Sequence, residues 1–385
     1  MAFGVITLVS QVSQKTQDQT EGGQGKGVGI LLLLSLLFCF FLGLELMGLS
    51  FKLFGRGFAE TLIETTTNPF VGLFVGILAT TLVQSSSTST SMTVGLVAGG
   101  ALTIEGAIPI IMGANIGTTV TNTIVSLAHV SRPEEFRRAF AGATVHDYFN
   151  WLAVLILLPL EIQTGYLART ANFLESALEG VGGIKLLNPL KMVLAPTADW
   201  VSGLLGKSGS LTLIVGILLT FLALRFLVKA LKVLLASRAE QVLHRTLFRS
   251  TPAAVFAGVA MTVMVQSSSI TTSVMVPLLG AGVVSLVQVF PFMVGANIGT
   301  TITAILAALV TGHPAAVSVA FSHLIFNITG GLLIYGIPVV RAIPLGLAQW
   351  TGNLASRNRF LAVVYIVFAF YGIPFLLLFS TGTLS

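Results

Sequence analysis

Two short motifs, each present twice, decide how this chain is organised. QSSS occurs at Gln84–Ser87 and again at Gln266–Ser269, and GANIGTT occurs at Gly113–Thr119 and again at Gly295–Thr301. Both pairs are offset by 182 residues, and around GANIGTT the aligned copies agree at nine of thirteen positions. HDYFN, which begins at His146, has a weaker counterpart in the sequence HLIFN. Agreement over so many positions predicts an internal duplication.

The composition places this duplication in a membrane. Of 385 residues, 54% are hydrophobic and 9% are charged, and the mean hydropathy is +0.94. A soluble domain is about 25% charged. The numbers exclude a cytosolic enzyme, a disordered chain and a nucleic-acid binder with a basic patch. The apolar residues form continuous runs instead of the alternation of a membrane β-barrel, so we predict an all-α integral membrane protein.

The apolar runs predict two kinds of membrane element. Five runs are long enough for a simple span, at about 28–49, 137–160, 211–236, 314–338 and 360–379. Runs at 104–129 and 286–310 contain GANIGTT and predict one discontinuous transmembrane helix in each copy. Runs at 69–100 and 252–282 contain QSSS, and at ~30 residues each exceeds one span of about 20 residues. We expect each of these two to be a re-entrant hairpin.

Counting crossings predicts that the two copies are inverted. Three spans separate the two QSSS sites, and an odd number reverses the second copy, as in many secondary transporters. Placing the N-terminus in the cytoplasm puts thirteen Lys and Arg residues inside and six outside, which favours this orientation. We expect no signal peptide. The predicted organisation is a cytoplasmic segment 1–26, a first repeat 27–161, an extracellular linker 162–210, a second repeat 211–338, and a C-terminal amphipathic segment with a last apolar helix, 339–385.

Each QSSS motif offers an amide and three hydroxyls at a helix break. The N–H groups that start the following half-helix favour an anion, and the carbonyls that end the preceding one favour a cation such as sodium. Hydroxyls that bond back within an ordinary membrane helix are the simpler alternative. Because the motif is duplicated at a fixed offset, we prefer a binding site.

GANIGTT combines packing residues with oxygen ligands. Gly113 and Gly117 match a small-xxx-small packing motif. Asn115 and Thr118 are not needed for packing, and the second copy repeats this placement at Asn297, Thr300 and Thr303. Amide carbonyls and hydroxyls are hard oxygen ligands, which suit an alkali cation and do not suit zinc.

Asp147 is the one acid well inside a predicted span, and an intramembrane carboxylate is costly enough to indicate function. Asn150 lies three residues further on, on about the same helix face. For His146 we favour a position near the membrane interface, paired with loop arginines. We assign no role to Glu45 or to Cys39, the single cysteine.

These motifs, with FRRAFAGATVHDYFNWL at Phe136–Leu152, resemble the type II sodium/phosphate cotransporters over about residues 69–330. The resemblance implies sodium-driven uptake of inorganic phosphate, preferentially divalent, by alternating access. It implies a phosphate site at Gln84, Ser85, Ser86, Ser87, Gln266, Ser267, Ser268 and Ser269. It implies sodium ligands at Thr118, Gln266, Ser267, Thr300 and Thr303, with Asp147 and Asn150 linked to electrogenic transport. Leu324 replaces the acid in the second copy, so an extra cation site is expected on one side only.

The chain departs from the animal members in lacking long cytoplasmic tails and an extracellular disulfide. We therefore expect a compact multi-pass protein of the bacterial inner membrane with a cytoplasmic N-terminus and no cofactor besides co-transported sodium; a homodimer stays open. The alternatives are a sodium-coupled carrier of sulfate or a carboxylate, a channel, and a membrane enzyme acting on phosphorylated lipid. The enzyme would need a base or nucleophile triad or a metal cluster, and we identify none.

Overall fold

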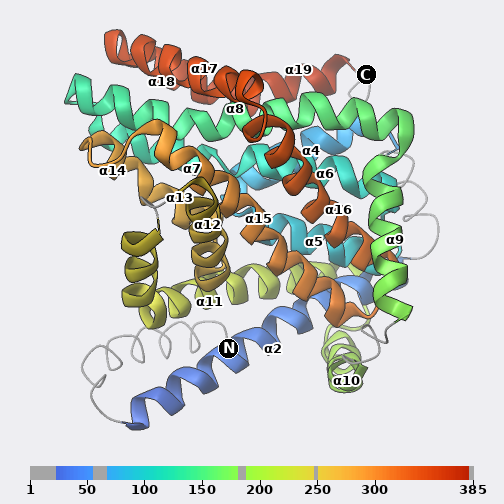
Figure 1. The fold of residues 1–385 in the computed structure, drawn as a ribbon. Helices are drawn as coiled ribbons and strands as arrows, with labels where there is room; N and C mark the ends of the chain where they lie inside the picture. Colours follow the sequence, from blue (N-terminus) through green and yellow to red (C-terminus); the bar gives the residue numbers. More distant parts are fainter. Residues whose placement is uncertain (1–22, 55–66, 181–187, 247–249, 381–385) are drawn as a thin grey trace.

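The computed structural model describes residues 23–54, 67–180, 188–246 and 250–380, so most of the predicted N-terminal segment lies outside the described residues. All the secondary structure described in these ranges is helical (Figure 1). The α-helices are α2 Gly23–Phe54, α4 Pro69–Val83, α5 Ser86–Ala98, α6 Ile104–Gly117, α7 Val120–Ser126, α8 Pro133–Thr164, α9 Tyr166–Gly180, α10 Asn188–Leu204, α11 Gly209–Thr246, α12 Thr251–Val265, α13 Ser268–Ser273, α14 Met275–Gly280, α15 Leu286–Thr311, α16 Pro314–Gly330, α17 Pro338–Arg357, α18 Arg359–Val367 and α19 Ile373–Ser380. Three short turns complete the path: η1 Leu127–His129, η3 Gly331–Tyr335 and η4 Phe368–Gly372.

Within the described residues, seven helical segments are long and apolar enough to cross a membrane. They match the five simple spans and the two GANIGTT runs expected from the sequence: Leu31–Phe54, Ile104–His129, Pro133–Thr164, Gly209–Leu227, Leu286–Thr311, Pro314–Tyr335 and Arg359–Leu376. The prediction of an all-α, multi-pass membrane protein is confirmed at this level. The linker expected at 162–210 contains two helices, α9 and α10.

Both QSSS motifs interrupt a helix in the same way. α4 ends at Val83, and its C-cap residue Gln84 adopts a left-handed conformation with φ 56° and ψ 31°. α12 ends in the same way, with its C-cap Gln266 at φ 55° and ψ 29°. The next residue, Ser85 or Ser267, has extended backbone and is the N-cap of the following helix. A left-handed residue cannot continue a right-handed helix. The predicted break is therefore present in both copies.

The glycines of GANIGTT hold helices close together, as the packing alternative proposed. A Cβ on Gly113 would collide with the backbone carbonyl of Leu73, where α6 packs on α4. A Cβ on Gly295 would collide with the carbonyl of Val255, where α15 packs on α12. The two contacts are related by the offset of 182 residues. The duplication therefore extends from sequence to packing.

The prediction of a discontinuous helix at both GANIGTT copies is wrong for the second. In the first copy α6 ends at Gly117 and α7 begins at Val120. In the second copy α15 runs unbroken through the motif, and Thr300 and Thr301 bond back to carbonyls of their own helix. Because the glycines serve close packing, the motif does not require a break. In the first copy Thr118 and Thr119 keep right-handed helical dihedrals, so the interruption between α6 and α7 is slight.

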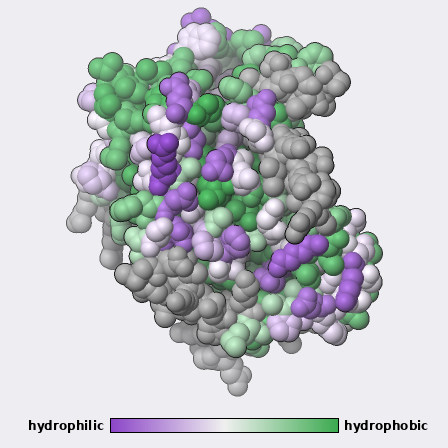
Figure 2. Space-filling model, turned by 90° about the vertical axis from the view of Figure 1, so that its right-hand side faces the viewer, coloured by the Kyte–Doolittle hydropathy of each residue, from purple (hydrophilic) through white to green (hydrophobic). Residues whose placement is uncertain are grey.

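Two pairs of packed helices enclose a layer that contains duplicated helices. α2 packs on α11, α8 packs on α17, and the layer between contains α4, α5, α6, α15 and α16 (Figure 1). The beginning of α8 and α14 lie at one end of the molecule, and α9 and α10 lie at the other (Figure 1). Figure 2 looks at the end with α9 and α10, where hydrophilic residues run in a band down the face and hydrophobic residues gather mainly at its upper margin.

Candidate functional site

The two QSSS motifs meet in the interior although they are far apart in sequence. The Ser87 hydroxyl lies 3.5 Å from the backbone carbonyl of Gln266, which is long for a hydrogen bond but brings the motifs into contact. The hydroxyls of Thr118 and Ser269 lie 2.9 Å apart, so the first GANIGTT touches the second QSSS. Residues from both copies therefore contribute to one polar region.

Serine caps begin the helices that leave this region. The Ser85 Oγ accepts the backbone N–H of Thr88 at 3.2 Å, and the Ser267 Oγ accepts that of Ile270 at 3.3 Å. The first residues after each cap are buried, namely Ser86, Ser87, Ser268 and Ser269. Helix starts carry unpaired N–H groups and a partial positive charge, so the region can hold an anion without a basic side chain.

The two glutamines of the motifs have different surroundings. Gln84 is exposed, whereas Gln266 is half-buried. Gln266 accepts the Thr303 hydroxyl at its Oε1, at 2.6 Å, and donates from Nε2 to the carbonyl of Val263, also at 2.6 Å. Two predicted sodium ligands, Gln266 and Thr303, are thus brought together. Thr300 instead donates to the carbonyl of Ala296 in its own helix.

A buried amide network joins the two GANIGTT copies to α8. The Asn297 Nδ2 donates to the Asn150 Oδ1 at 2.7 Å. The Asn150 Nδ2 donates to the backbone carbonyl of Asn115 at 2.6 Å. The Asn115 side chain donates to the carbonyl of Ile111. All three asparagines are buried. Three predicted sodium ligands therefore lie in one network whose amide orientations are set by their partners.

The expected pairing of His146 with loop arginines is wrong, because the structure buries this residue in the same network. Its Nε2 lies 2.8 Å from the Asn297 Oδ1, and its Nδ1 lies 3.4 Å from the Asn122 Nδ2. A carbonyl oxygen only accepts and an amide nitrogen only donates, so these partners define a neutral ring that carries its proton on Nε2. The Thr272 hydroxyl lies 3.0 Å from the Asn122 Oδ1 and 2.8 Å from the carbonyl of Ser268 in its own helix, so it shares its proton between the two acceptors.

Asp147 is fully buried but belongs to a different set of contacts from Asn150. Its Oδ2 accepts the Tyr365 hydroxyl at 2.9 Å and lies 3.3 Å from the Thr123 hydroxyl. Its Oδ1 has no hydrogen-bond partner in the described part of the chain. The structure therefore does not place Asp147 and Asn150 on a shared partner.

Sequence reasoning missed several residues of these networks. Asn122 and Thr272 are polar residues within apolar runs and follow the two motifs closely, so their position was a usable signal. Tyr365 gave no such signal, because a tyrosine near the end of an apolar run is usually an interfacial residue. Its contact with Asp147 depends on how α18 packs against α8.

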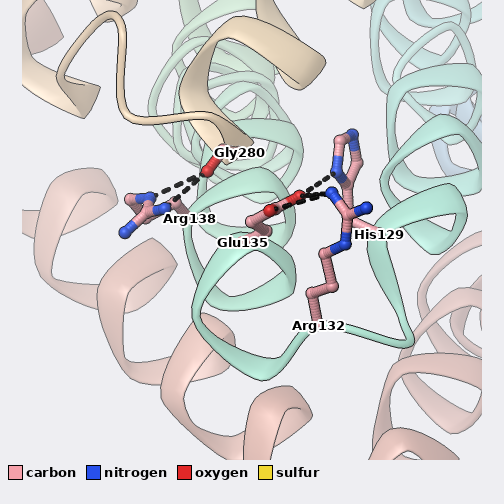
Figure 3. Close-up of polar contacts among 5 residues, drawn as sticks. All are labelled: His129, Arg132, Glu135, Arg138 and Gly280. Carbon is pink, nitrogen blue, oxygen red and sulfur yellow. Dashed lines mark hydrogen bonds and ion pairs between the residues drawn. The ribbon is translucent and has the colours of Figure 1, made fainter.

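Near the beginning of α8, an arginine side chain binds the C-terminal end of α14. The Arg138 Nε and Nη2 both donate to the carbonyl of Gly280, at 3.0 and 2.7 Å (Figure 3). Beside this contact Glu135 bonds to Arg132 at 3.0 Å and to the ring of His129 at 3.4 Å (Figure 3). The end of the second QSSS segment is therefore attached to the first copy.

The fold and these contacts define the class of protein: a multi-pass α-helical membrane protein with a duplicated, hydroxyl- and amide-lined interior. A sequence model described as Na+/Pi-cotransporter matches residues 39–166 and 217–341. The chain belongs to this family.

The curated relatives agree with that assignment. The chain is 34% identical to the sodium-dependent phosphate transport protein 2B of Pongo abelii over 91% of its own length and 65% of the relative's. It is 35% identical to sodium-dependent phosphate transport protein 2A of Ovis aries, over 89% of the chain and 66% of the relative. It therefore spans about two thirds of the length of the relatives that it matches. No solved structure gives a significant match.

Proposed function

We propose that this protein is a secondary active transporter that couples inward sodium movement to the uptake of inorganic phosphate, and not an enzyme. Family membership and the names of the relatives support this proposal. The observation that carries it is the meeting of the two QSSS motifs, where the Ser87 hydroxyl reaches the carbonyl of Gln266. Two capped helix starts at one place provide N–H and O–H donors for the oxygens of one anion.

The phosphate ligands we propose are the eight QSSS residues at 84–87 and 266–269. The hydrogen bonds found for them go to hydroxyls, amides and backbone groups. An anion held without a basic side chain is expensive to remove from water. Sodium ions bound nearby supply the missing positive charge, which is the physical reason for coupling.

The sodium ligands we propose form groups around this site. Thr118, Gln266, Ser267, Thr300 and Thr303 supply hydroxyl and amide oxygens next to the second QSSS motif. Asn115, Asn150 and Asn297 supply further amide groups from the buried network. Asp147, with its free Oδ1, is the proposed ligand of the sodium ion that makes transport electrogenic.

We further propose that the repeats are inverted, each with a re-entrant QSSS hairpin, and that transport occurs by alternating access. The far end of α5 supports this, because Gly99 contacts Gly48 near the end of α2. The far end of α14 contacts Arg138 near the beginning of α8. With both α2 and α8 starting in the cytoplasm, the two hairpins enter from opposite sides. The bacterial inner membrane, the cytoplasmic N-terminus and a homodimer remain predictions.

The function is tested by phosphate uptake into proteoliposomes. We expect an inward sodium gradient to drive accumulation of labelled phosphate and an equal potassium gradient to drive none. Ser86→Leu and Ser268→Leu should each abolish uptake, because a bulky apolar side chain displaces the anion. Ser131→Leu is the matched control, since Ser131 is exposed outside the site.

Three other results would contradict the proposal. Sodium-dependent uptake of sulfate or a carboxylate that phosphate does not inhibit would identify a carrier of another anion. Release of phosphate from a phosphorylated lipid would identify an enzyme. Normal phosphate affinity in both serine variants would remove the QSSS motifs from the site.

A further inference from the structure

Tyr365 reaches the polar interior from outside the part of the chain that the family match covers. It lies in α18, whereas that match ends at residue 341. Its hydroxyl donates to the Asp147 Oδ2 at 2.9 Å, between residues 218 positions apart. Its ring packs edge-on against Phe140, with the centroids 5.8 Å apart, and lies 6.1 Å from the ring of Tyr148. α18 is therefore attached to α8 at Asp147, the one acid in the middle of α8.

The contact uses one carboxylate oxygen and leaves the other without a partner. Besides Tyr365, the Thr123 hydroxyl lies 3.3 Å from Oδ2, and it lies 3.2 Å from the carbonyl of Thr119 as well. The Thr119 side chain is also beside this carboxyl group, but its hydroxyl donates to the carbonyl of Ile116 at 2.8 Å. One hydroxyl proton serves one acceptor well, so the phenol is the stronger donor. The Oδ1 atom is buried and unpartnered among the described residues.

The hydrogen-bond donor to Asp147 is a phenol, which is neutral. An ionised carboxylate at membrane depth needs donors or an opposite charge. No ion pair with Asp147 occurs in the part of the chain that the structure describes. A neutral donor stabilises the carboxylate and fixes its rotation while leaving its charge available to a cation.

We propose that Tyr365 is a positioning residue of the cation site: by holding Oδ2 of Asp147 it directs Oδ1 toward a sodium ion. The inference rests on the proposed function, because it assigns Asp147 to a transported cation. It extends the site to α18, a helix to which neither the duplicated motifs nor the family match points.

The test is Tyr365→Phe, which removes the hydroxyl and keeps the ring packing. We expect the half-saturating sodium concentration for phosphate uptake to rise about tenfold, as for the loss of one hydrogen bond to a charged group. The phosphate KM at saturating sodium should change less than twofold. In the purified protein, the sodium concentration that gives half of the sodium-induced Tm increase should rise by the same factor. Tyr371→Phe is the matched control, because Tyr371 is an exposed tyrosine in η4.

A double-mutant cycle separates positioning from a general effect on packing. In an Asp147→Asn background, Tyr365→Phe should change the half-saturating sodium concentration less than twofold. An effect of equal size in both backgrounds would show that Tyr365 acts by packing alone and would overturn the proposal.

The wild-type measurements distinguish the proposed transport function from the proposed positioning role of Tyr365. If wild-type uptake depends on sodium and Tyr365→Phe leaves both sodium curves unchanged, the positioning role is wrong and the transport function stands. If wild type shows no sodium-dependent uptake but its sodium-induced Tm increase is weakened by Tyr365→Phe, the transport function fails and the cation site stands. If wild type shows neither sodium-dependent uptake nor a sodium-induced Tm increase, both proposals fail.

Discussion

Among single residues, the buried amides and the histidine show how polar groups are kept in an apolar interior. His146 lies between Asn122 and Asn297, and each partner is oriented by a further bond, to Thr272 and Asn150 respectively. Such a network is stable only when every member is satisfied, because an unpaired buried polar group costs about 1–3 kcal/mol. The network therefore holds Asn297, a proposed sodium ligand, in one orientation.

Replacing His146 should test that orientation. His146→Leu leaves the Asn297 Oδ1 and the Asn122 Nδ2 unpaired, so we expect a loss of stability of about 2–6 kcal/mol from two such groups. His146→Gln, which keeps a donor and an acceptor, should lose less than half as much. Thermal unfolding of both purified variants is the measurement. Wild-type Tm values for both variants would show that the hydrogen bonds of His146 contribute nothing to stability.

Among the elements, α14 depends on a contact with the other copy. It is a helix of 6 residues, and its last carbonyl, that of Gly280, accepts two donors from Arg138 on α8. A guanidinium forms such forked contacts, which an ammonium group cannot reproduce. The backbone end of the second QSSS segment is therefore held by a side chain from the first copy.

Weakening this contact should loosen the end of α14. For Arg138→Lys we expect amide hydrogen exchange in a peptide covering 275–285 to become about tenfold faster, because one charge-assisted hydrogen bond is lost. Arg137→Lys is the control, since Arg137 pairs with Glu134 within its own helix. Exchange followed by mass spectrometry in detergent gives both rates. Faster exchange in the control alone would assign the stabilising role to Arg137.

In the whole molecule, the two copies have similar local structures but different partners. Their helix breaks and their glycine contacts repeat at the same offset, so their local structures are alike. The copies differ in their partners: α15 is continuous where α6 and α7 are separate, and Gln266 is bonded where Gln84 is exposed. In the proposed alternating-access mechanism, one copy moves against the other around the site between them.

The inverted arrangement predicts the sides from which two loops react. Cysteines placed at Ser131 and at Gly203 should be labelled from opposite sides of the membrane, because α8 is the one candidate span between them. Ser131 is exposed, and a Cβ at Gly203 meets no neighbouring atom within 4 Å. The background is Cys39→Ala, which removes the single native cysteine. If one impermeant reagent labels both positions from the same side, the inverted arrangement is wrong.

The sequence by itself determined the membrane class, the duplication and the position of the helix breaks at QSSS. Composition and apolar runs are properties of the chain, and a break depends on local capping residues such as Ser85 and Ser267. It also indicated Asn115 and Asn297 as polar residues without a packing role, and Asn150 by its place on the same helix face as Asp147. These features could be predicted because each depends on neighbouring residues.

Only the tertiary structure decided which polar groups meet. The pairs Thr118 with Ser269, His146 with Asn297, and Asp147 with Tyr365 join residues 151, 151 and 218 positions apart. Sequence patterns could not distinguish a break in α15 from close packing on α12, because glycine serves both purposes. Hydrogen bonds between distant helices depend on their relative rotation and depth, which follow from the packing of the whole molecule.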